Sequence, residues 1–327
     1  MKTEHIFSIN NEKNFNDIAL EIFHFQYKGN EIYRQFCDLM KVDLSLIDHF
    51  SQIPFLPIEL FKSKEVFTFV EEKNRPQLFT SSGTSGQITS KHIVSDVAVY
   101  EQSFLKGFEL FYGSPKEYCI LALLPSYLER SGSSLVYMFQ HLIEMTKENG
   151  SGFYLHNLNE LKEKISALKK SKQKTILLGV TYALLDLAEM NVPLNENFRL
   201  METGGMKGKR KELLKEELHT ILKEKFSVNT IHSEYGMTEL LSQAYSKGNG
   251  IFECPPWLKI LVRDPYDPTQ LLPANKTGAL NVIDLANINS CSFIATSDLG
   301  KVSENNSFEI LGRIDDAELR GCNLMML

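Results

Sequence analysis

Apolar and polar positions alternate along this chain with two different periods, which predict helices and strands. Near the N-terminus, one helical face is indicated by apolar residues at helical spacing: Phe15, Ile18, Ala19, Ile22 and Phe23. Residues up to about 75 are therefore expected to form a helical entry region, which Pro54 and Pro57 interrupt.

The middle of the chain alternates between strand-like and helix-like segments. Strands are predicted at 78–80, 118–124, 152–155, 175–180 and 199–202. Helices are predicted at 97–111, 135–145, 182–188 and 209–226. Apolar strands that alternate with helices are typical of a sheet covered on both faces, so the predicted fold class is α/β.

From about Lys259 the pattern changes to short strand-like pieces. They read KILVR, GALNVIDL and SFIAT, and Asp, Pro and Asn turns separate them. The sequence therefore predicts two parts. Residues 1–258 form a large α/β domain with the helical entry region, and residues 259–327 form a β-rich subdomain with a tail.

Composition and charge exclude several classes of protein. The chain has 327 residues, is 43% hydrophobic and 23% charged, and carries a net charge of -6, which argues against a nucleic-acid partner. Its five cysteines lack CxxC spacing and predict neither a zinc site nor a disulfide framework: Cys37, Cys119, Cys254, Cys291 and Cys322. Without a signal peptide or a long apolar run, we expect a cytoplasmic protein with no membrane span.

Two motifs carry candidate chemistry. Residues 80–86 read TSSGTSG, in which glycines let N–H and O–H groups converge on an anionic oxygen, although a flexible linker remains an open alternative. Residues 234–239 read EYGMTE and set the Thr238 hydroxyl beside the Glu239 carboxylate, a pair that suits magnesium and phosphate. His92 and His232 lie near these motifs, and the sequence leaves open whether they face a ligand or pack in the interior.

The order of four motifs resembles the adenylate-forming superfamily of acyl-CoA synthetases and adenylation domains. These motifs are SSGTSG, YGMTE, TSD at 296–298 and GRIDD at 312–316. The segment LPSYLERSGSSLVYM at 124–138 and the tail RGC are most similar to the LuxE-type acyl-protein synthetase family. The resemblance spans about Phe79 to Cys322 and implies a ligase that activates a carboxylic acid with ATP and Mg²⁺.

The resemblance also implies roles for individual residues. The β- and γ-phosphates would be held by Ser81, Ser82, Gly83, Thr84, Ser85 and Gly86. Adenine would be lined by Gly204, Gly205 and Met206 and stacked on Tyr235, with Gly236 beside it. Asp298 would accept the ribose hydroxyls, and Arg313 would contact the nucleotide at the hinge. Thr238 would contact phosphate, and Glu239 would be the magnesium ligand.

Other interpretations of several residues stay open. Gly204 and Gly205 also fit a turn before a helix, Asp298 a β-turn, and Arg313 an exposed strand position.

The C-terminal residues bear on which group accepts the acyl group. The superfamily carries a lid domain with a catalytic lysine beyond GRxDD, and this sequence ends at Leu327, so the resemblance predicts that the lid is absent. Cys322 matches the cysteine to which the family passes the acyl group as a thioester, although an incidental tail cysteine is an equal alternative.

The resemblance further implies a fatty acid substrate and an acyl-accepting or acyl-reducing partner protein. Two other functions stay open. One is a CoA ligase whose lid comes from another chain, and the other is a non-catalytic protein that binds a nucleotide or an acyl adenylate.

Overall fold

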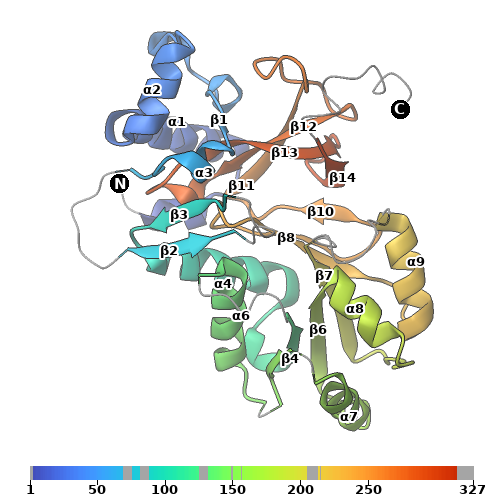
Figure 1. The fold of residues 1–327 in the computed structure, drawn as a ribbon. Coiled ribbons are helices and arrows are strands. Elements are labelled where there is room, and N and C mark those ends of the chain that lie inside the picture. The colour runs from blue at the N-terminus through green and yellow to red at the C-terminus, as the bar shows by residue number, and fades with distance from the viewer. Residues whose placement is uncertain are drawn as a thin grey trace.

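A large mixed sheet forms the centre of the computed structural model, which describes residues 3–68, 76–81, 88–124, 132–148, 150–155, 157–204, 213 and 215–314. Among these residues, twelve strands form one sheet in the order β11-β12-β13-β14-β10-β9-β8-β7-β6-β4-β5, and β1 (Leu56–Pro57) pairs with β13 (Figure 1). A separate antiparallel pair consists of β2 (Gln77–Thr80) and β3 (Lys91–Val94).

One half of the sheet is parallel. Its strands are β4 (Tyr118–Leu123), β5 (Gly152–Tyr154), β6 (Lys174–Val180), β7 (Phe198–Thr203) and β8 (His232–Tyr235). Every residue of β4 is buried, as expected for a parallel strand covered on both faces. The predicted α/β sheet is therefore confirmed in this half.

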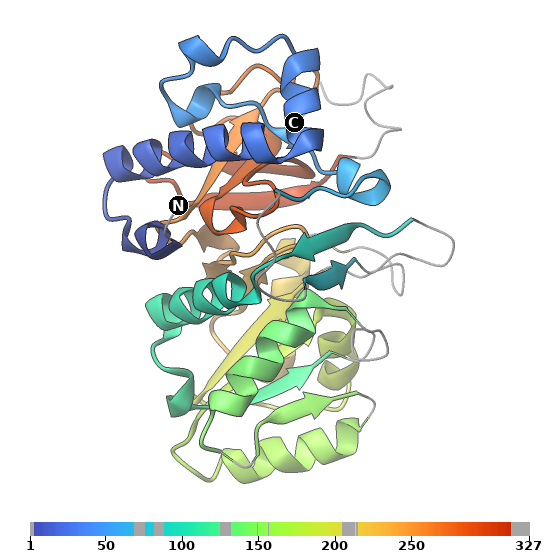
Figure 2. The ribbon, with the colours of Figure 1, turned by 90° about the vertical axis from the view of Figure 1, so that its left-hand side faces the viewer.

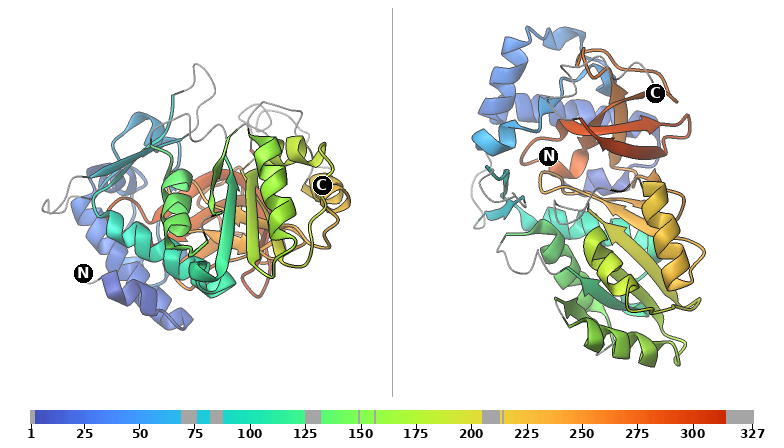
Figure 3. Two further views of the ribbon diagram at one scale, coloured as in Figure 1. Left: turned by 90° about the horizontal axis from the view of Figure 1, so that it is seen from below. Right: turned by 45° about the vertical axis from the view of Figure 1, so that its right-hand side comes forward.

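Helices cover both faces of the parallel half. On one side lie α4 (Val97–Tyr112) and α6 (Ser134–Met145), and on the other lie α7 (Leu158–Leu168), α8 (Thr181–Ala188) and α9 (Lys215–Phe226) (Figure 3). The helix predicted at 209–226 is described from Lys215 onward. The sequence analysis did not single out α7, although its buried residues Leu161, Ile165 and Leu168 follow helical spacing.

The other half of the sheet is antiparallel. Its strands are β9 (Ala244–Ser246), β10 (Ile251–Glu253), β11 (Leu258–Arg263), β12 (Thr277–Asp284), β13 (Phe293–Val302) and β14 (Phe308–Arg313). Burial alternates along β11, so one face of that strand is covered more than the other. The sheet runs through both predicted parts of the chain, and the division at residues 258 and 259 stays a prediction.

The N-terminal helices pack on strands from the far end of the sequence. Helix α1 (Glu12–Gly29) lies across the antiparallel strands and is followed by α2 (Glu31–Leu39) (Figure 2). The buried Gln26 amide of α1 donates to Asn287 O at 3.1 Å and to Ile288 O at 2.8 Å, and its Oε1 accepts from Ser292 N at 3.0 Å. The entry region thus fixes the short 3-10 helix η5 (Leu285–Asn287).

None of the helices in the described ranges is long and apolar enough to cross a membrane.

Replacing Gln26 tests how much this contact contributes to stability. Gln26→Leu keeps the side-chain volume but leaves buried backbone groups without partners, so we expect the free energy of unfolding to fall by about 2–4 kcal/mol. Urea denaturation followed by circular dichroism would measure it. The matched control is Gln35→Leu, because Gln35 bonds Glu31 on the exposed face of α2, and a change above about 0.5 kcal/mol is not expected there. Equal effects of the two variants would contradict the prediction.

Candidate active site

Strand β8 ends in the loop that contains most of the candidate residues. All four residues of β8 are buried, and the chain then continues into residues 236–239. A Cβ atom on Gly236 would lie 2.6 Å from Glu234 Oε1 and 3.4 Å from Gln243 Cγ. A larger residue at this position would force the Glu234 carboxyl group to move, because that group lies against the Gly236 backbone.

Three predicted residues from different motifs meet in one hydrogen-bonded cluster. The Tyr235 hydroxyl donates to Asp298 Oδ2 at 2.8 Å, and Arg313 Nε donates to Asp298 Oδ1 at 3.2 Å. Asp298 on β13 and Arg313 on β14 are direct cross-strand partners. Burial raises the pKa of Tyr235 far above its usual range, so the phenol stays protonated and remains a donor.

The two ends of this cluster differ in exposure. The Asp298 side chain is 8% exposed, whereas that of Arg313 is 73% exposed. The Tyr235 ring packs edge-on against Phe252 and Phe308, with ring centroids 6.0 and 5.6 Å away. The cluster therefore presents a carboxylate and a guanidinium group at the edge of a packed aromatic core.

The backbone of Thr238 and Glu239 is anchored by two buried side chains. His92 Nδ1 lies 2.7 Å from Thr238 O, and His92 Nε2 lies 3.0 Å from Asn287 Oδ1. Asn287 Nδ2 donates to Glu239 O at 2.7 Å. Strand β3 and η5 thereby hold the loop that follows β8. The sequence analysis noted His92 but left its role open, and it missed Asn287, which no local motif marks.

The ring of His92 is neutral at pH 7. Burial lowers the pKa of His92 to about 4, although the hydrogen bonds to Thr238 and Asn287 act in the opposite direction by favouring the charged ring. A neutral imidazole carries one ring proton, so it donates to only one of its two oxygen partners.

The Glu239 carboxyl group is almost fully buried. Glu239 is 6% exposed, and burial raises its pKa, while the Ser90 hydroxyl group and the charges of Arg313 and Lys62 oppose that rise. Within the described ranges it forms no ion pair with a basic side chain. A buried carboxylate of this kind gains stability from a bound cation, so Glu239 fits a metal ligand.

No group of three or more His, Cys, Asp or Glu that could hold a metal is found in the part of the chain that the structure describes. Mg²⁺ is commonly bound by one or two carboxylates together with water and substrate phosphates, and the buried carboxyl group of Glu239 fits such a ligand. The chemistry of the site therefore fits a metal that arrives with a nucleotide.

Two further candidates lie at the bases of their loops. Ser81 Oγ accepts from Ser90 N at 2.9 Å, which joins the two strands at the neck of the Ser/Gly loop. Gly204 follows β7 with a φ of 67°, and its carbonyl oxygen accepts from Thr181 Oγ1 at 2.8 Å. The remaining candidates lie outside the described residues: Ser82, Gly83, Thr84, Ser85, Gly86, Gly205, Met206 and Cys322.

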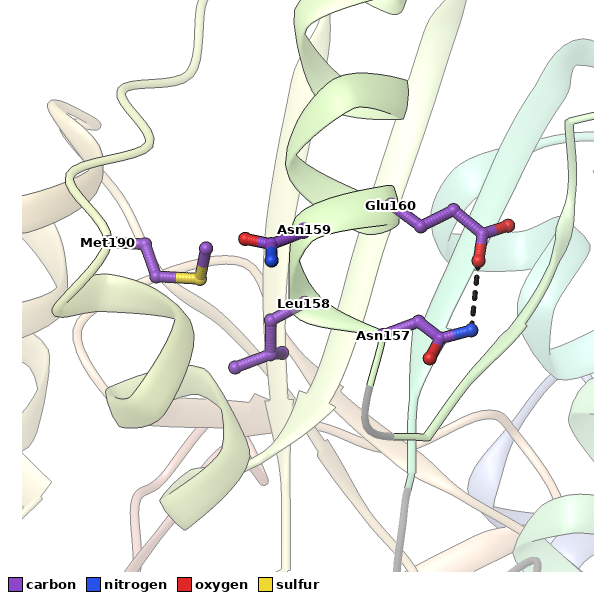
Figure 4. A pocket seen from close by; sticks show the side chains of 5 residues that line it. All are labelled: Asn157, Leu158, Asn159, Glu160 and Met190. Carbon is purple, nitrogen blue, oxygen red and sulfur yellow. Dashed lines mark hydrogen bonds between the residues drawn. The ribbon is translucent and has the colours of Figure 1, made fainter.

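A separate hollow of about 420 Å³ lies at the start of α7. Its lining residues are shown in Figure 4: Asn157, Leu158, Asn159, Glu160 and Met190. Asn157 Nδ2 donates to Glu160 Oε2 at 3.0 Å within it. None of these residues belongs to the candidate site, so the hollow is not assigned to the chemistry.

Comparison with known proteins places this chain in a family. The family model for acyl-protein synthetase, LuxE, matches residues 6–327. The long-chain-fatty-acid–luciferin-component ligase of Vibrio harveyi is 23% identical over 93% of this chain and 85% of that protein. The ligase of the same description from Aliivibrio fischeri is 24% identical over 98% of this chain and 89% of that protein.

Solved structures confirm the adenylate-forming fold. The open conformation of 2-hydroxyisobutyryl-CoA ligase, in complex with 2-HIB-AMP and CoA, has a TM-score of 0.70 at 13% identity and covers 93% of this chain and 70% of that chain. ATP-bound MatB from Rhodopseudomonas palustris has a TM-score of 0.54 at 19% identity, and the match covers 72% of this chain and 47% of that chain. The match thus spans about half the length of MatB.

The neutral state of His92 predicts a pH dependence of stability. Between pH 6.5 and about pH 4, the His92 ring is mostly protonated in the unfolded chain but mostly neutral in the folded chain. The stability of the wild type should therefore fall, relative to His92→Gln, by up to about 3 kcal/mol as the pH is lowered from 6.5 to 4. Urea titrations at several pH values would measure it. His24→Gln, at an exposed position, is the control, and parallel profiles for wild type and His92→Gln would rule the prediction out.

Proposed function

Because this chain belongs to the acyl-protein synthetase family of ligases described as LuxE, we propose that it activates a carboxylic acid with ATP and transfers the acyl group to a thiol. The observation that carries the proposal is the cluster of Tyr235, Asp298 and Arg313 beside the loop that bears Glu239. These residues come from three separate motifs, and their convergence supports a nucleotide site at the end of β8.

In this proposal the nucleotide lies against that cluster. Each oxygen of the Asp298 carboxylate accepts one protein hydrogen bond and keeps a further lone pair for a ribose hydroxyl group. Arg313 offers its exposed guanidinium group to the nucleotide, and Tyr235 with Gly236 would lie next to adenine. Gly204, Gly205 and Met206 complete the adenine site, and residues 81–86 would bind the β- and γ-phosphates.

The first step joins two negatively charged reactants. A substrate carboxylate oxygen forms a bond to the α-phosphorus while the bond from that phosphorus to the pyrophosphate oxygen breaks, and pyrophosphate leaves with the electron pair. Thr238 would donate to a phosphate oxygen, and Glu239 would hold Mg²⁺. When bound, the metal neutralises phosphate charge that would otherwise repel the carboxylate.

The second step transfers the acyl group to sulfur. A thiolate attacks the acyl carbon, the bond from that carbon to AMP breaks, and the thiol proton passes to solvent. Cys322 is the proposed acceptor. The described cysteines are poor nucleophiles, because burial raises the pKa of Cys37 to about 12 and raises that of Cys254 and Cys291 further. The names of the relatives support a fatty acid as the substrate. A partner protein that accepts or reduces the acyl group would carry out the next reaction.

Glu239→Gln tests the first step. Removing the charge that holds the metal should lower acid-dependent exchange of pyrophosphate into ATP by about 100-fold or more. The matched control is Glu304→Gln, because Glu304 is an exposed turn residue whose loss should leave exchange unchanged. An exchange rate that Glu239→Gln does not alter would contradict the metal role. Absence of exchange by the wild type with short, aromatic and long-chain acids would favour a non-catalytic nucleotide-binding protein.

Cys322→Ser tests the second step. Wild-type protein incubated with ATP and a radiolabelled fatty acid should retain a label that hydroxylamine removes, since thioesters are cleaved by hydroxylamine. We expect Cys322→Ser to lose this label while it keeps pyrophosphate exchange. Cys254→Ser is the control and should label normally. A label that survives in Cys322→Ser would assign the acyl acceptor to another residue.

A further inference from the structure

The Glu234 carboxyl group is buried without a charged partner. Glu234 is 6% exposed, and Thr203 Oγ1 donates to its Oε2. Its Oε1 has no hydrogen-bond donor among the described residues, and no basic side chain there forms an ion pair with it. Burial raises the pKa of Glu234 to about 7, and the charge of Glu202 acts in the same direction. Among the described residues, therefore, only one of the two carboxyl oxygens of Glu234 accepts a hydrogen bond.

Two neighbouring side chains also carry a buried polar atom that lacks a hydrogen-bond partner among the described residues. Tyr245 on β9 is the direct cross-strand partner of Glu234, so both side chains lie on the same face of the sheet. The Tyr245 hydroxyl and Gln243 Oε1 are both buried and have no hydrogen-bond partner among the residues that the structure describes. Gln243 and Glu234 both approach the position that a Cβ of Gly236 would occupy. Glu234 and Gln243 thus lie together beside Gly236, and Tyr245 is paired with Glu234 on the neighbouring strand.

Such a group of polar atoms needs an explanation. A buried donor or acceptor without a partner costs about 1–3 kcal/mol, and folded proteins contain few of them. The cost is removed if a bound molecule supplies the missing donors and acceptors. Glu234 Oε1 and Gln243 Oε1 both accept, and the Tyr245 hydroxyl can donate or accept, so the missing partner carries N–H or O–H groups.

The position of Glu234 relative to Tyr235 indicates which substrate it faces. Successive side chains of a strand point to opposite faces of the sheet. Tyr235 points toward Asp298 and the proposed nucleotide site. Glu234 points to the other face, where its charge acts on Tyr100 and Tyr112 of α4. An acid that meets the nucleotide at the loop after β8 therefore approaches from the side of Glu234.

Resting on the proposed function, we infer that Glu234, Gln243 and Tyr245 form a polar subsite that selects an acid with a hydroxyl or amino group close to its carboxyl group. The subsite adjoins Gly236, so the donor group lies near the reacting end of the substrate. An unsubstituted hydrocarbon chain at this place would supply no hydrogen-bond partner to Glu234 Oε1, Gln243 Oε1 or the Tyr245 hydroxyl. Sites built to bond a substrate O–H or N–H discriminate strongly against analogues that lack it.

Pyrophosphate exchange with matched acids tests this subsite. The probes are butyrate, 3-hydroxybutyrate and 3-aminobutyrate, together with decanoate and 3-hydroxydecanoate. We expect kcat/KM for a hydroxy or amino acid to exceed that of the plain acid of the same length by about 100-fold or more. Glu234→Leu should reduce this ratio at least tenfold, and Tyr245→Phe should also reduce it. Glu234→Gln keeps a neutral acceptor, so it should retain a preference for the hydroxy acid and lose one for the amino acid.

Controls separate this inference from the adenylation proposal. If no acid supports exchange by the wild type, adenylation itself fails. If plain acids react as well as their hydroxy and amino analogues, adenylation stands and the subsite is refuted. A ratio that Glu234→Leu leaves unchanged also refutes it. Tyr266→Phe, at a side chain that is 60% exposed, should leave the ratio as in the wild type. If Glu234→Leu does not fold, the wild-type ratio and Tyr245→Phe decide the question.

Discussion

The anchoring of the loop after β8 is the constraint on which the candidate site depends. Residues 236–239 belong to no strand or helix, so the carbonyl oxygens of Thr238 and Glu239 are bonded by side chains instead. His92 and Asn287 supply those bonds at 2.7 Å each. Because both anchors are buried, they hold the backbone of Thr238 and Glu239 in place.

These anchors join parts of the chain that are distant in sequence. His92 lies on β3, at the base of the Ser/Gly loop, and it contacts Asn287 of η5 at 3.0 Å. Gln26 of α1 bonds the backbone of Asn287 in turn. The N-terminal helix, the β2–β3 pair and the loop after β8 therefore form one continuous hydrogen-bonded unit. Gln26, Asn287 and Glu239 are thus linked by successive hydrogen bonds.

Strand β8 separates two chemical environments at its end. On one face Tyr235 and Asp298 belong to a cluster that ends in an exposed guanidinium group, which suits a charged nucleotide. On the other face Glu234 lies among buried tyrosines and has no cationic partner in the described chain. The alternation of side chains along a strand makes this possible, because adjacent residues serve opposite faces without any change of backbone.

The sequence by itself determined the local elements and the motifs. The continuous apolar runs predicted β4 and β6, since strands covered on both faces need no polar side. The order of YGMTE, TSD and GRIDD indicated an adenylating enzyme, and the family and fold comparisons bear this out. The roles assigned to single residues remain predictions, and several of them lie outside the described part of the chain.

Only the tertiary structure decided which residues meet. Tyr235 and Asp298 are 63 positions apart, and His92 and Asn287 are 195 positions apart, so no local pattern reveals these contacts. The sequence likewise does not reveal that the buried polar atoms of Gln243 and Tyr245 lack hydrogen-bond partners in the described part of the chain. Periodicity predicts that a side chain is buried, but the presence of a hydrogen-bond partner depends on chain segments that come together only on folding.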